Sequence, residues 1–220
     1  MVLIMAKKNI LDEFPAIVQA NKELTQKQKD VLIASIRLFA EQGYANTSTH
    51  QIAVAAHQSE GTMFKHFKSK ANILRTALEP LIKQIIPDVE AEFKRDTLNH
   101  PTESLHDFLD YFVRNRMAFA EENQDAIKVF FSELLYNESL RQEFIETARE
   151  ELIAAFKDTI ADLQHRHLMI DWPFTEIFRY IIAVIVGYVI DRYVLFPNRD
   201  WDDDVEAGYL VTELEKVLQP

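Results

Sequence analysis

Glycine is scarce in this chain. Four of its 220 residues are glycine, and the Asn-Gly and Asp-Gly pairs that mark tight hairpins do not occur. No stretch shows the sustained alternation of polar and apolar residues, bounded by turn signals, that is typical of strands. Leucine, alanine, glutamate, lysine and glutamine, which favour helices, are frequent throughout. The sequence therefore predicts an all-α fold.

The chain also contains no cysteine, which excludes disulfides, thiolate zinc sites and cysteine nucleophiles and is typical of a reducing compartment. Its longest apolar stretch, residues 177–196, is interrupted by Arg179, Asp191 and Arg192. Each charge at the centre of a membrane would cost roughly 2.5 to 3.5 kcal/mol, so a buried helix is favoured over a membrane span. We expect a cytoplasmic protein without a membrane segment.

Helix signals begin at Thr25, where Gln28 completes a capping box three residues later. This first helix is predicted to end at Gly43, with a left-handed conformation at the glycine. The sequence before Thr25 carries no helix signal of comparable strength, and we treat residues 1–24 as an N-terminal extension.

Two shorter helices are predicted next. One begins at Thr47 or Ser48 and runs to about Ala55, and the other begins at Ser59 and ends near Phe67. Because only a short turn separates them, the three helices have the layout of a helix-turn-helix unit.

Charge separates this region from the rest of the chain. Residues 25–70 contain six Lys or Arg and three acidic residues, a net charge of +3. Residues 71–220 contain fifteen Lys or Arg and twenty-nine acidic residues, a net charge of −14. Residues 1–24 have no net charge. The difference indicates two domains with opposite electrostatic roles.

The acidic remainder has the pattern of successive amphipathic helices. They are predicted over residues 73–86, 103–121, 124–136, 139–164, 174–196 and from 202 or 203 to 218.

The helix that begins at Ser59 carries groups suited to DNA. Its first-turn amides can receive a phosphate, and Gly61 has no side chain to obstruct that approach. Met63 and Phe67 are expected to pack inward. The side chains available to bases and phosphates are Thr62, Phe64, Lys65, His66, Lys68 and Lys70. Taken alone, the same cluster could be only a solvated basic helix end.

Residues 32–74 resemble the DNA-binding region of the TetR family of transcriptional regulators. The shared features are the helix ending in LFAEQGY, Thr47 opening the second helix, Ile52 with Ala53, and the pattern S-x-G-T-x-F-x-x-F-K-S-K from Ser59 to Lys70. The resemblance implies a three-helix DNA-binding domain over residues 25–70. It also implies a larger helical domain for ligand binding and dimerisation over residues 71–220.

The resemblance further implies which residues contact DNA: Thr49, His50, Gly61, Thr62, Phe64, Lys65, His66 and Lys70. Four residues depart from the family pattern, among them Gln58, which stands where an apolar residue is frequent. His57 replaces the usual turn glycine and is expected to take a left-handed conformation, which histidine tolerates better than most residues. Glu60 repels phosphate but can accept from a cytosine amino group, and Phe64 replaces a common tyrosine.

A dimer is expected because one helix-turn-helix unit reads only a few base pairs, whereas two-fold symmetry places two units on a palindrome. The last two helices are the candidate interface, since the helix at 174–196 is apolar nearly all round, and the resemblance supports this choice. The alternative is a helix that is simply central to its own domain. The candidate interface residues are Ile181, Ala183, Val184, Gly187, Tyr188 and Asp191.

Family members commonly bind a small molecule in the larger domain, and the resemblance implies an unidentified effector here. The candidate residues are Phe108, Phe112, Arg116, Phe119 and Phe130, although aromatic residues at helical spacing are also ordinary core residues. Arg116 lies on an apolar stripe and needs either an acidic partner or an anionic ligand, of which the acidic partner is favoured.

The expected function is therefore a TetR-like regulator, in the commoner case a repressor, that binds a palindromic operator in double-stranded DNA as a homodimer and is released by its effector. No catalytic residue, cofactor or metal is expected. One alternative is a helical-bundle metalloenzyme, since Glu103 and His106 form a Glu-x-x-His pair, but no second pair exists. The other is a helical adaptor that uses the basic stretch for a protein or membrane surface and binds DNA only weakly and without sequence specificity.

Overall fold

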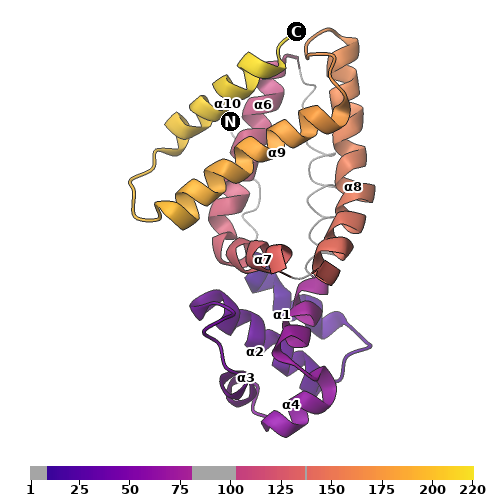
Figure 1. Cartoon of the computed structure of the whole chain (residues 1–220), viewed down its shortest axis with the longest axis vertical. Helices are drawn as coiled ribbons and strands as arrows, with labels where there is room; N and C mark the ends of the chain where they lie inside the picture. Colours follow the sequence, from indigo (N-terminus) through magenta and orange to yellow (C-terminus); the bar gives the residue numbers. More distant parts are fainter. Residues whose placement is uncertain (1–8, 81–102, 137) are drawn as a thin grey trace. The chain divides into compact units, whose positions relative to one another are not determined.

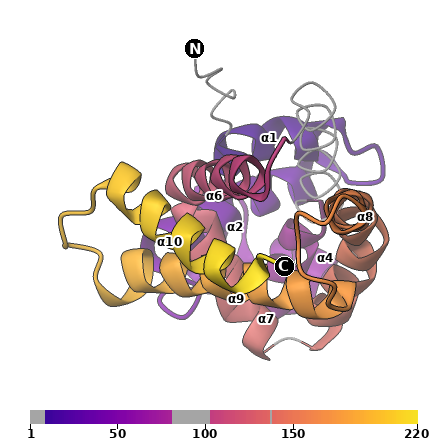
Figure 2. The ribbon, with the colours of Figure 1, turned by 90° about the horizontal axis from the view of Figure 1, so that it is seen from above.

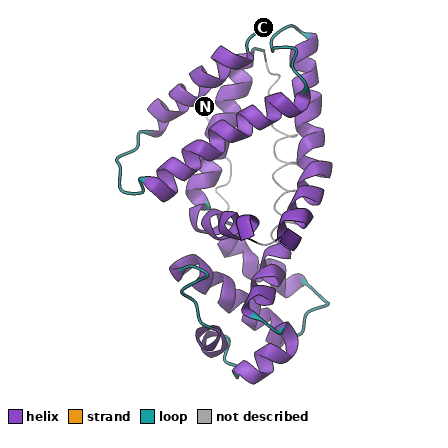
Figure 3. Cartoon of the chain, viewed as in Figure 1, coloured by secondary structure: helices purple, strands orange, loops and turns teal. Residues whose placement is uncertain are grey.

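The computed structural model describes residues 9–80, 103–136 and 138–220, and every regular element in these ranges is a helix (Figures 1 and 3). The all-α prediction is confirmed. The chain divides into two compact units, of which the first comprises Met1–Asp88 with Asn123–Ala148 and the second Val89–Glu122 with Arg149–Pro220. None of the described helices is long and apolar enough to span a lipid bilayer.

The first unit contains the three predicted N-terminal helices close to their expected bounds. They are α2 (Gln26–Gln42), α3 (Thr49–Ala55) and α4 (Glu60–Phe67). The helix that follows is described over residues 70–80, and the rest of its predicted course to residue 86 lies outside the described residues. The unit also includes α7 (Gln124–Tyr136), which packs on α2.

A helix that the sequence analysis did not predict lies before α2. Helix α1 (Ile10–Ala20) packs on α2, and its Phe14 and Val18 are fully buried. Asn9 caps the helix by accepting from the amide of Leu11. The segment 1–24 is therefore only partly an extension, because residues 10–20 contribute to the core of the first unit. The domain boundary at residues 70 and 71 stays a prediction.

Helix α2 supplies the centre of the first unit. The expected capping box is present, with the hydroxyl of Thr25 accepting from the amide of Gln28 and the side chain of Gln28 accepting from the amide of Thr25. Gly43 ends the helix with a positive φ of 83°, but its ψ of 154° lies outside the predicted left-handed helical region. The inward residues, all at most 2 % exposed, come from four helices: Val31, Leu32, Ile36, Phe39, Ile52, Met63, Phe67, Ile73 and Leu74.

The second unit is built from α6 (Leu105–Glu122), the later part of α8 (Glu138–His165), α9 (Phe174–Ile190) and α10 (Asp203–Leu218). Their bounds lie within two residues of the predicted ones, except that the helix predicted to reach residue 196 changes to a π-helical turn, η1, at Asp191–Leu195. Helices α6 and α10 pack side by side and α9 contacts both (Figures 1 and 2).

Aromatic side chains join three helices of this second unit. Phe112 of α6 meets Phe156 of α8 edge to face at 4.9 Å between centroids, and Phe156 meets Phe178 of α9 at 5.5 Å. Phe108 stacks on Phe112, and Phe174 stacks on Phe178. The row is a continuous part of the unit's apolar core.

Candidate nucleic-acid interface

Helix α3 begins with a second capping box. The hydroxyl of Ser48 accepts from the amide of Gln51 at 3.1 Å, and the side chain of Gln51 accepts from the amide of Ser48 at 2.7 Å. Thr47 is buried just before the helix, where its hydroxyl donates to the carbonyl of Gly43 at 2.8 Å. These bonds fix where the helix starts, so Thr49 and His50 occupy its first turn.

The turn between α3 and α4 is a Schellman motif. The amide of His57 donates to the carbonyl of Val54 at 3.0 Å, and the amide of Gln58 donates to that of Ala53 at 2.9 Å. His57 has a φ of 54°, the left-handed conformation expected at this position, where glycine is most common. The side-chain amide of Gln58 donates to the carbonyl of Lys27 at 2.6 Å, which fastens the turn to α2.

Helix α4 separates inward and outward residues as predicted. Ser59 caps it by accepting from the amide of Thr62, and Met63 and Phe67 are buried in the unit's core. Across the helix, the exposed residues are Gly61, Lys65 and His66, with Lys68 directly after them, while Thr62 and Phe64 are half-buried at the edges. The outward face is therefore cationic and polar.

Packing inside the protein does not explain why residue 61 is a glycine. A methyl group at this position would meet only the hydroxyl of Ser59, 4.0 Å away, and the backbone is helical without a positive φ. Glycine inside a helix is roughly 0.5 to 1 kcal/mol less stable than alanine. The protein therefore tolerates a destabilising residue at an exposed position of α4.

Glu60 joins α3 to α4, a role that the sequence did not reveal. The hydroxyl of Thr49 donates to Oε1 of Glu60 at 2.7 Å. Nδ1 of His50 lies 4.0 Å from Oε2 of the same carboxylate. Two of the residues predicted to contact DNA are thus gathered around one acid.

Lys70 has an internal role besides the predicted one. Its ammonium donates to the carbonyls of Tyr44 at 2.7 Å and Thr47 at 2.9 Å, and lies 4.2 Å from the centroid of the Tyr44 ring. Lys70 therefore ties the start of the next helix to the loop between α2 and α3. Its contact with a phosphate, through the remaining proton, stays a prediction.

The predicted effector residues occupy different positions in the second unit. Phe108 and Phe112 are buried, whereas Arg116 and Phe119 are half-buried at the edge of the stripe. Arg116 donates to the side chain of Asn115, and its guanidinium lies 5.4 Å from the Phe119 centroid and 5.8 Å from the Phe112 centroid. The side chain of Phe130 lies outside the described part of the chain. An acidic or anionic partner for Arg116 stays a prediction.

The candidate interface residues of α9, with Asp191 at the start of η1, lie on two sides of the helix. Ile181 and Tyr188 are buried in the second unit itself, and Val184 and Asp191 are half-buried. Ala183 and Gly187 are exposed, and nothing lies within 4 Å of the position that a side chain at Gly187 would take. The face available to a partner therefore runs through the small residues.

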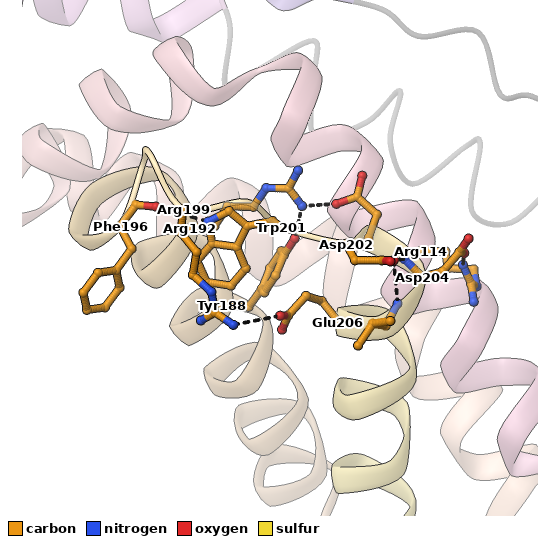
Figure 4. Close-up of polar contacts among 11 residues, drawn as sticks. Arg114, Tyr188, Arg192, Phe196, Arg199, Trp201, Asp202, Asp204 and Glu206 are labelled. Carbon is orange, nitrogen blue, oxygen red and sulfur yellow. Dashed lines mark hydrogen bonds and ion pairs between the residues drawn. The ribbon is translucent and has the colours of Figure 1, made fainter.

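The corner between α9 and α10 is held by an ion-pair and aromatic cluster that sequence reasoning missed (Figure 4). Arg192 donates to Asp203 and to the hydroxyl of Tyr188, while the ring of Trp201 meets that of Tyr188 edge to face. Burial alone would lower the pKa of Arg192, but its hydrogen bonds to Asp203 and Tyr188 outweigh burial and raise the pKa. Burial raises the pKa of the Tyr188 phenol.

Two further arginines extend this corner cluster. Arg114 of α6 bonds to Asp110 at 2.9 Å and to Asp204 at 2.6 Å. Arg199 pairs with Glu206 at 3.5 Å, and its guanidinium lies 4.3 Å from the Trp201 centroid (Figure 4). The cluster fixes the first turn of α10 against α6 and α9.

The Glu-x-x-His pair considered for metal binding is not assembled into a larger ligand set. Nδ1 of His106 lies 3.2 Å from Oε2 of Glu215 on α10, and this hydrogen bond raises the pKa of His106. Among the described residues, no group of three or more histidine or acidic side chains is placed to hold a metal ion.

The capped α3, the left-handed turn and the half-buried α4 define a helix-turn-helix protein. Residues 31–77 match the family model described as "Bacterial regulatory proteins, tetR family". The match identifies these residues as the DNA-binding region of the TetR family. The chain is 27 % identical over 204 residues to the uncharacterised HTH-type transcriptional regulator YerO of Bacillus subtilis, covering 89 % of this chain and 66 % of that protein.

Two other proteins extend the comparison. The HTH-type transcriptional repressor AcnR of Corynebacterium diphtheriae is 29 % identical over 96 residues, which cover 42 % of this chain and 50 % of AcnR. A protein from Saccharomonospora viridis, described as a transcriptional regulator and crystallised with choline, has a TM-score of 0.65 at 22 % identity. That alignment covers 87 % of this chain and 96 % of that chain, and it shows the fold. The chain spans less than two thirds of the length of YerO and AcnR.

Proposed function

We propose that this protein is a DNA-binding transcriptional regulator without catalytic activity. The observation that carries the proposal is the outward face of α4, where Lys65 and His66 are exposed together with Gly61, a glycine that packing does not require. Such a face suits a helix that enters the major groove and approaches the phosphate backbone closely. A regulator of this kind acts where the chromosome is, so the proposal includes a cytoplasmic location.

The proposed form on DNA is a homodimer on a palindromic operator. Support comes from exposed apolar or small residues of α9, η1 and α10: Ala183, Gly187, Ile190, Val194, Val205, Gly208 and Tyr209. A side chain at Gly208, like one at Gly187, would meet nothing within 4 Å. Two glycines that internal packing does not need permit the close approach of a second pair of helices.

The proposal includes release from DNA by a small molecule bound in the second unit. The structural neighbour from Saccharomonospora viridis holds choline, and the corresponding unit here contains the aromatic row from Phe108 to Phe178. A ligand that favours one of two dimer shapes would change the spacing of the two α4 helices, which must lie about 34 to 36 Å apart on the duplex. Repression is the proposed sign of regulation, as the name of AcnR states for that relative.

The decisive experiment is selection of bound fragments from random duplex DNA by the full chain, followed by titration of the selected duplex at several salt concentrations. We expect a two-fold symmetric sequence and a dimer as the bound species. Affinity should fall by about 1,000-fold or more between 50 and 200 mM salt if six or more phosphates are contacted. Recovery of no common sequence, with binding independent of the duplex chosen, would contradict the proposal and favour a non-specific adaptor.

A further inference from the structure

An acid opens the helix that is proposed to enter DNA. Of the three acidic residues in residues 25–70, Asp30 and Glu41 belong to α2, and Glu60 alone belongs to α4. Glu60 directly precedes Gly61 and Thr62, which are predicted to contact DNA. A carboxylate there favours the helix dipole but repels every nearby phosphate, so stabilising α4 is not a sufficient reason for it on a DNA-binding face.

The carboxylate is held in one place by the neighbouring helix. The 2.7 Å hydrogen bond from Thr49 fixes Oε1, and Nδ1 of His50 lies 4.0 Å from Oε2. The Glu60 side chain nevertheless stays 42 % exposed. An ionised carboxylate has about four acceptor positions, of which Thr49 occupies one. Glu60 is therefore an oriented acceptor with free capacity on the outward side of the α3–α4 junction.

The chemistry of base edges selects the partner of such a group. In the major groove, cytosine presents only an amino donor, guanine presents two acceptors, and thymine presents an acceptor and a methyl group. Adenine has an amino donor, but its N7 acceptor lies beside it and repels a carboxylate. An acceptor that cannot donate therefore fits cytosine best and is opposed by thymine and guanine.

We propose that Glu60 is a specificity-determining residue that accepts a hydrogen bond from the exocyclic amine of a cytosine in each half of the operator, with Thr49 as its positioning residue. The inference rests on the proposed function, since it requires that α4 lies in the major groove. In this role Glu60 lets the protein discriminate between DNA sequences, while its repulsion of phosphates lowers the affinity for DNA of any sequence.

The test begins with selection from random duplex DNA by the wild-type chain and by Glu60→Gln. The wild-type sequences should contain an invariant cytosine in each half-site, and that cytosine should no longer be required by the variant. The selected duplex is then compared with one in which this C·G pair is replaced by T·A. The wild type should bind the T·A duplex about tenfold more weakly or worse. Glu60→Gln, whose amide can donate to thymine O4, should discriminate by less than about threefold.

Two further variants separate base reading from charge and from folding. Glu41→Gln removes the same charge from an exposed position on α2 and should keep the wild-type discrimination. Thr49→Val removes the hydroxyl that orients Glu60, so its discrimination should fall between those of the wild type and Glu60→Gln, while its thermal unfolding stays cooperative.

The outcomes distinguish this inference from the proposed function. If the wild type selects a symmetric sequence but Glu60→Gln selects the same one with equal discrimination, the role of Glu60 is refuted and the regulator remains. If Glu41→Gln loses discrimination equally, general charge rather than base reading is responsible, and the inference is likewise refuted. If the wild type selects no sequence at all, the proposed function itself fails.

Discussion

The outward face of α4 and the exposed faces of α9 and α10 make an informative pair. Each is a helical surface that carries glycine where the protein's own packing does not require it, at Gly61 on one and at Gly187 and Gly208 on the other. Their neighbours differ in kind. Around Gly61 lie lysine, histidine and threonine together with the carboxylate of Glu60, whereas the surroundings of the other two glycines include exposed Ile190, Val205 and Tyr209.

The difference indicates two different partners. A glycine that destabilises its own helix is explained if something outside the helix must come close. Cationic and hydrogen-bonding neighbours match a phosphate backbone and base edges, whereas apolar neighbours match another protein surface. A substitution at each face should therefore affect a different measurement.

The largest effect is expected from Gly187→Glu. A dimer would place this carboxylate and its symmetry mate in an apolar interface, at a penalty of about 3 kcal/mol or more, which is about 100-fold in the dimer dissociation constant. The fold of the monomer should be retained, because the new side chain meets nothing within 4 Å of its attachment point. Sedimentation equilibrium measures the dissociation constant, and circular dichroism the fold.

Thr175→Glu is the matched control for this variant. Thr175 is exposed in the first turn of the same helix, about 18 Å along the axis from Gly187. Equal dimer dissociation constants for the two variants would mean that the dimer contact does not involve Gly187. The glycines of α9 and α10 would then no longer be comparable with Gly61.

A smaller effect is expected from two lysines near α4 that the structure treats differently. Lys65 is exposed on the outward face, whereas the ammonium of Lys70 is bonded to the carbonyls of Tyr44 and Thr47. Lys65→Met should leave the thermal midpoint unchanged and weaken operator binding by roughly tenfold to 100-fold. Lys70→Met should lower stability by about 1 to 3 kcal/mol, because two carbonyls lose a charged donor.

Calorimetry and DNA titration of both variants separate the two roles. At about 2 to 4 °C per kcal/mol for a chain of this size, the Lys70 effect is measurable. A salt slope that flattens by about one in Lys70→Met would mean that its remaining proton also reaches a phosphate. An unchanged thermal midpoint in that variant would contradict the anchoring role.

Gly61→Ala should act in opposite directions on folding and on binding. The methyl group has room, and alanine favours the helix, so stability should rise by roughly 0.4 to 1 kcal/mol. Operator affinity should fall because the methyl group keeps the helix away from the backbone of the DNA. Gly208→Ala is the comparison: it should raise stability similarly, and any loss of operator affinity should come from weaker dimerisation rather than from the DNA-facing helix. If Gly61→Ala binds the operator as tightly as the wild type, the DNA backbone does not need to approach residue 61 closely, and that explanation of the glycine is refuted.

Local chemistry explains why the helix-turn-helix unit could be predicted so well. The capping boxes at Thr25 and Ser48 need only residues three apart, and the left-handed turn at His57 follows from where two short helices must end and begin. Such signals act within a few residues, so they are visible in the sequence before any packing is known.

Long-range contacts account for what the sequence did not show. Helix α1 contains Pro15 and is only 11 residues long, so it depends on burying Phe14 and Val18 rather than on its own propensity. Lys70 finds acceptors that are 23 and 26 residues away, and the carboxylate of Glu60 receives its bond from a different helix. No periodicity in the chain indicates those partners.

The smallest effect concerns His106, which belongs to neither exposed face. The hydrogen bond to Glu215 raises the pKa of His106 above 6.5, and burial opposes the shift. The pair therefore stabilises the fold fully at pH values below the pKa of this histidine in the unfolded chain. The contribution is lost as the pH rises through its pKa in the folded protein. His106→Asn should therefore lower the thermal midpoint at pH 5.5 but not at pH 8.5. The pair is solvent-exposed, so the difference should be at most about 1 kcal/mol. Operator affinity and dimerisation should not change, because the histidine joins α6 to α10 within the second unit. A destabilisation that is equal at both pH values would mean that the imidazole acts through packing rather than through its charge.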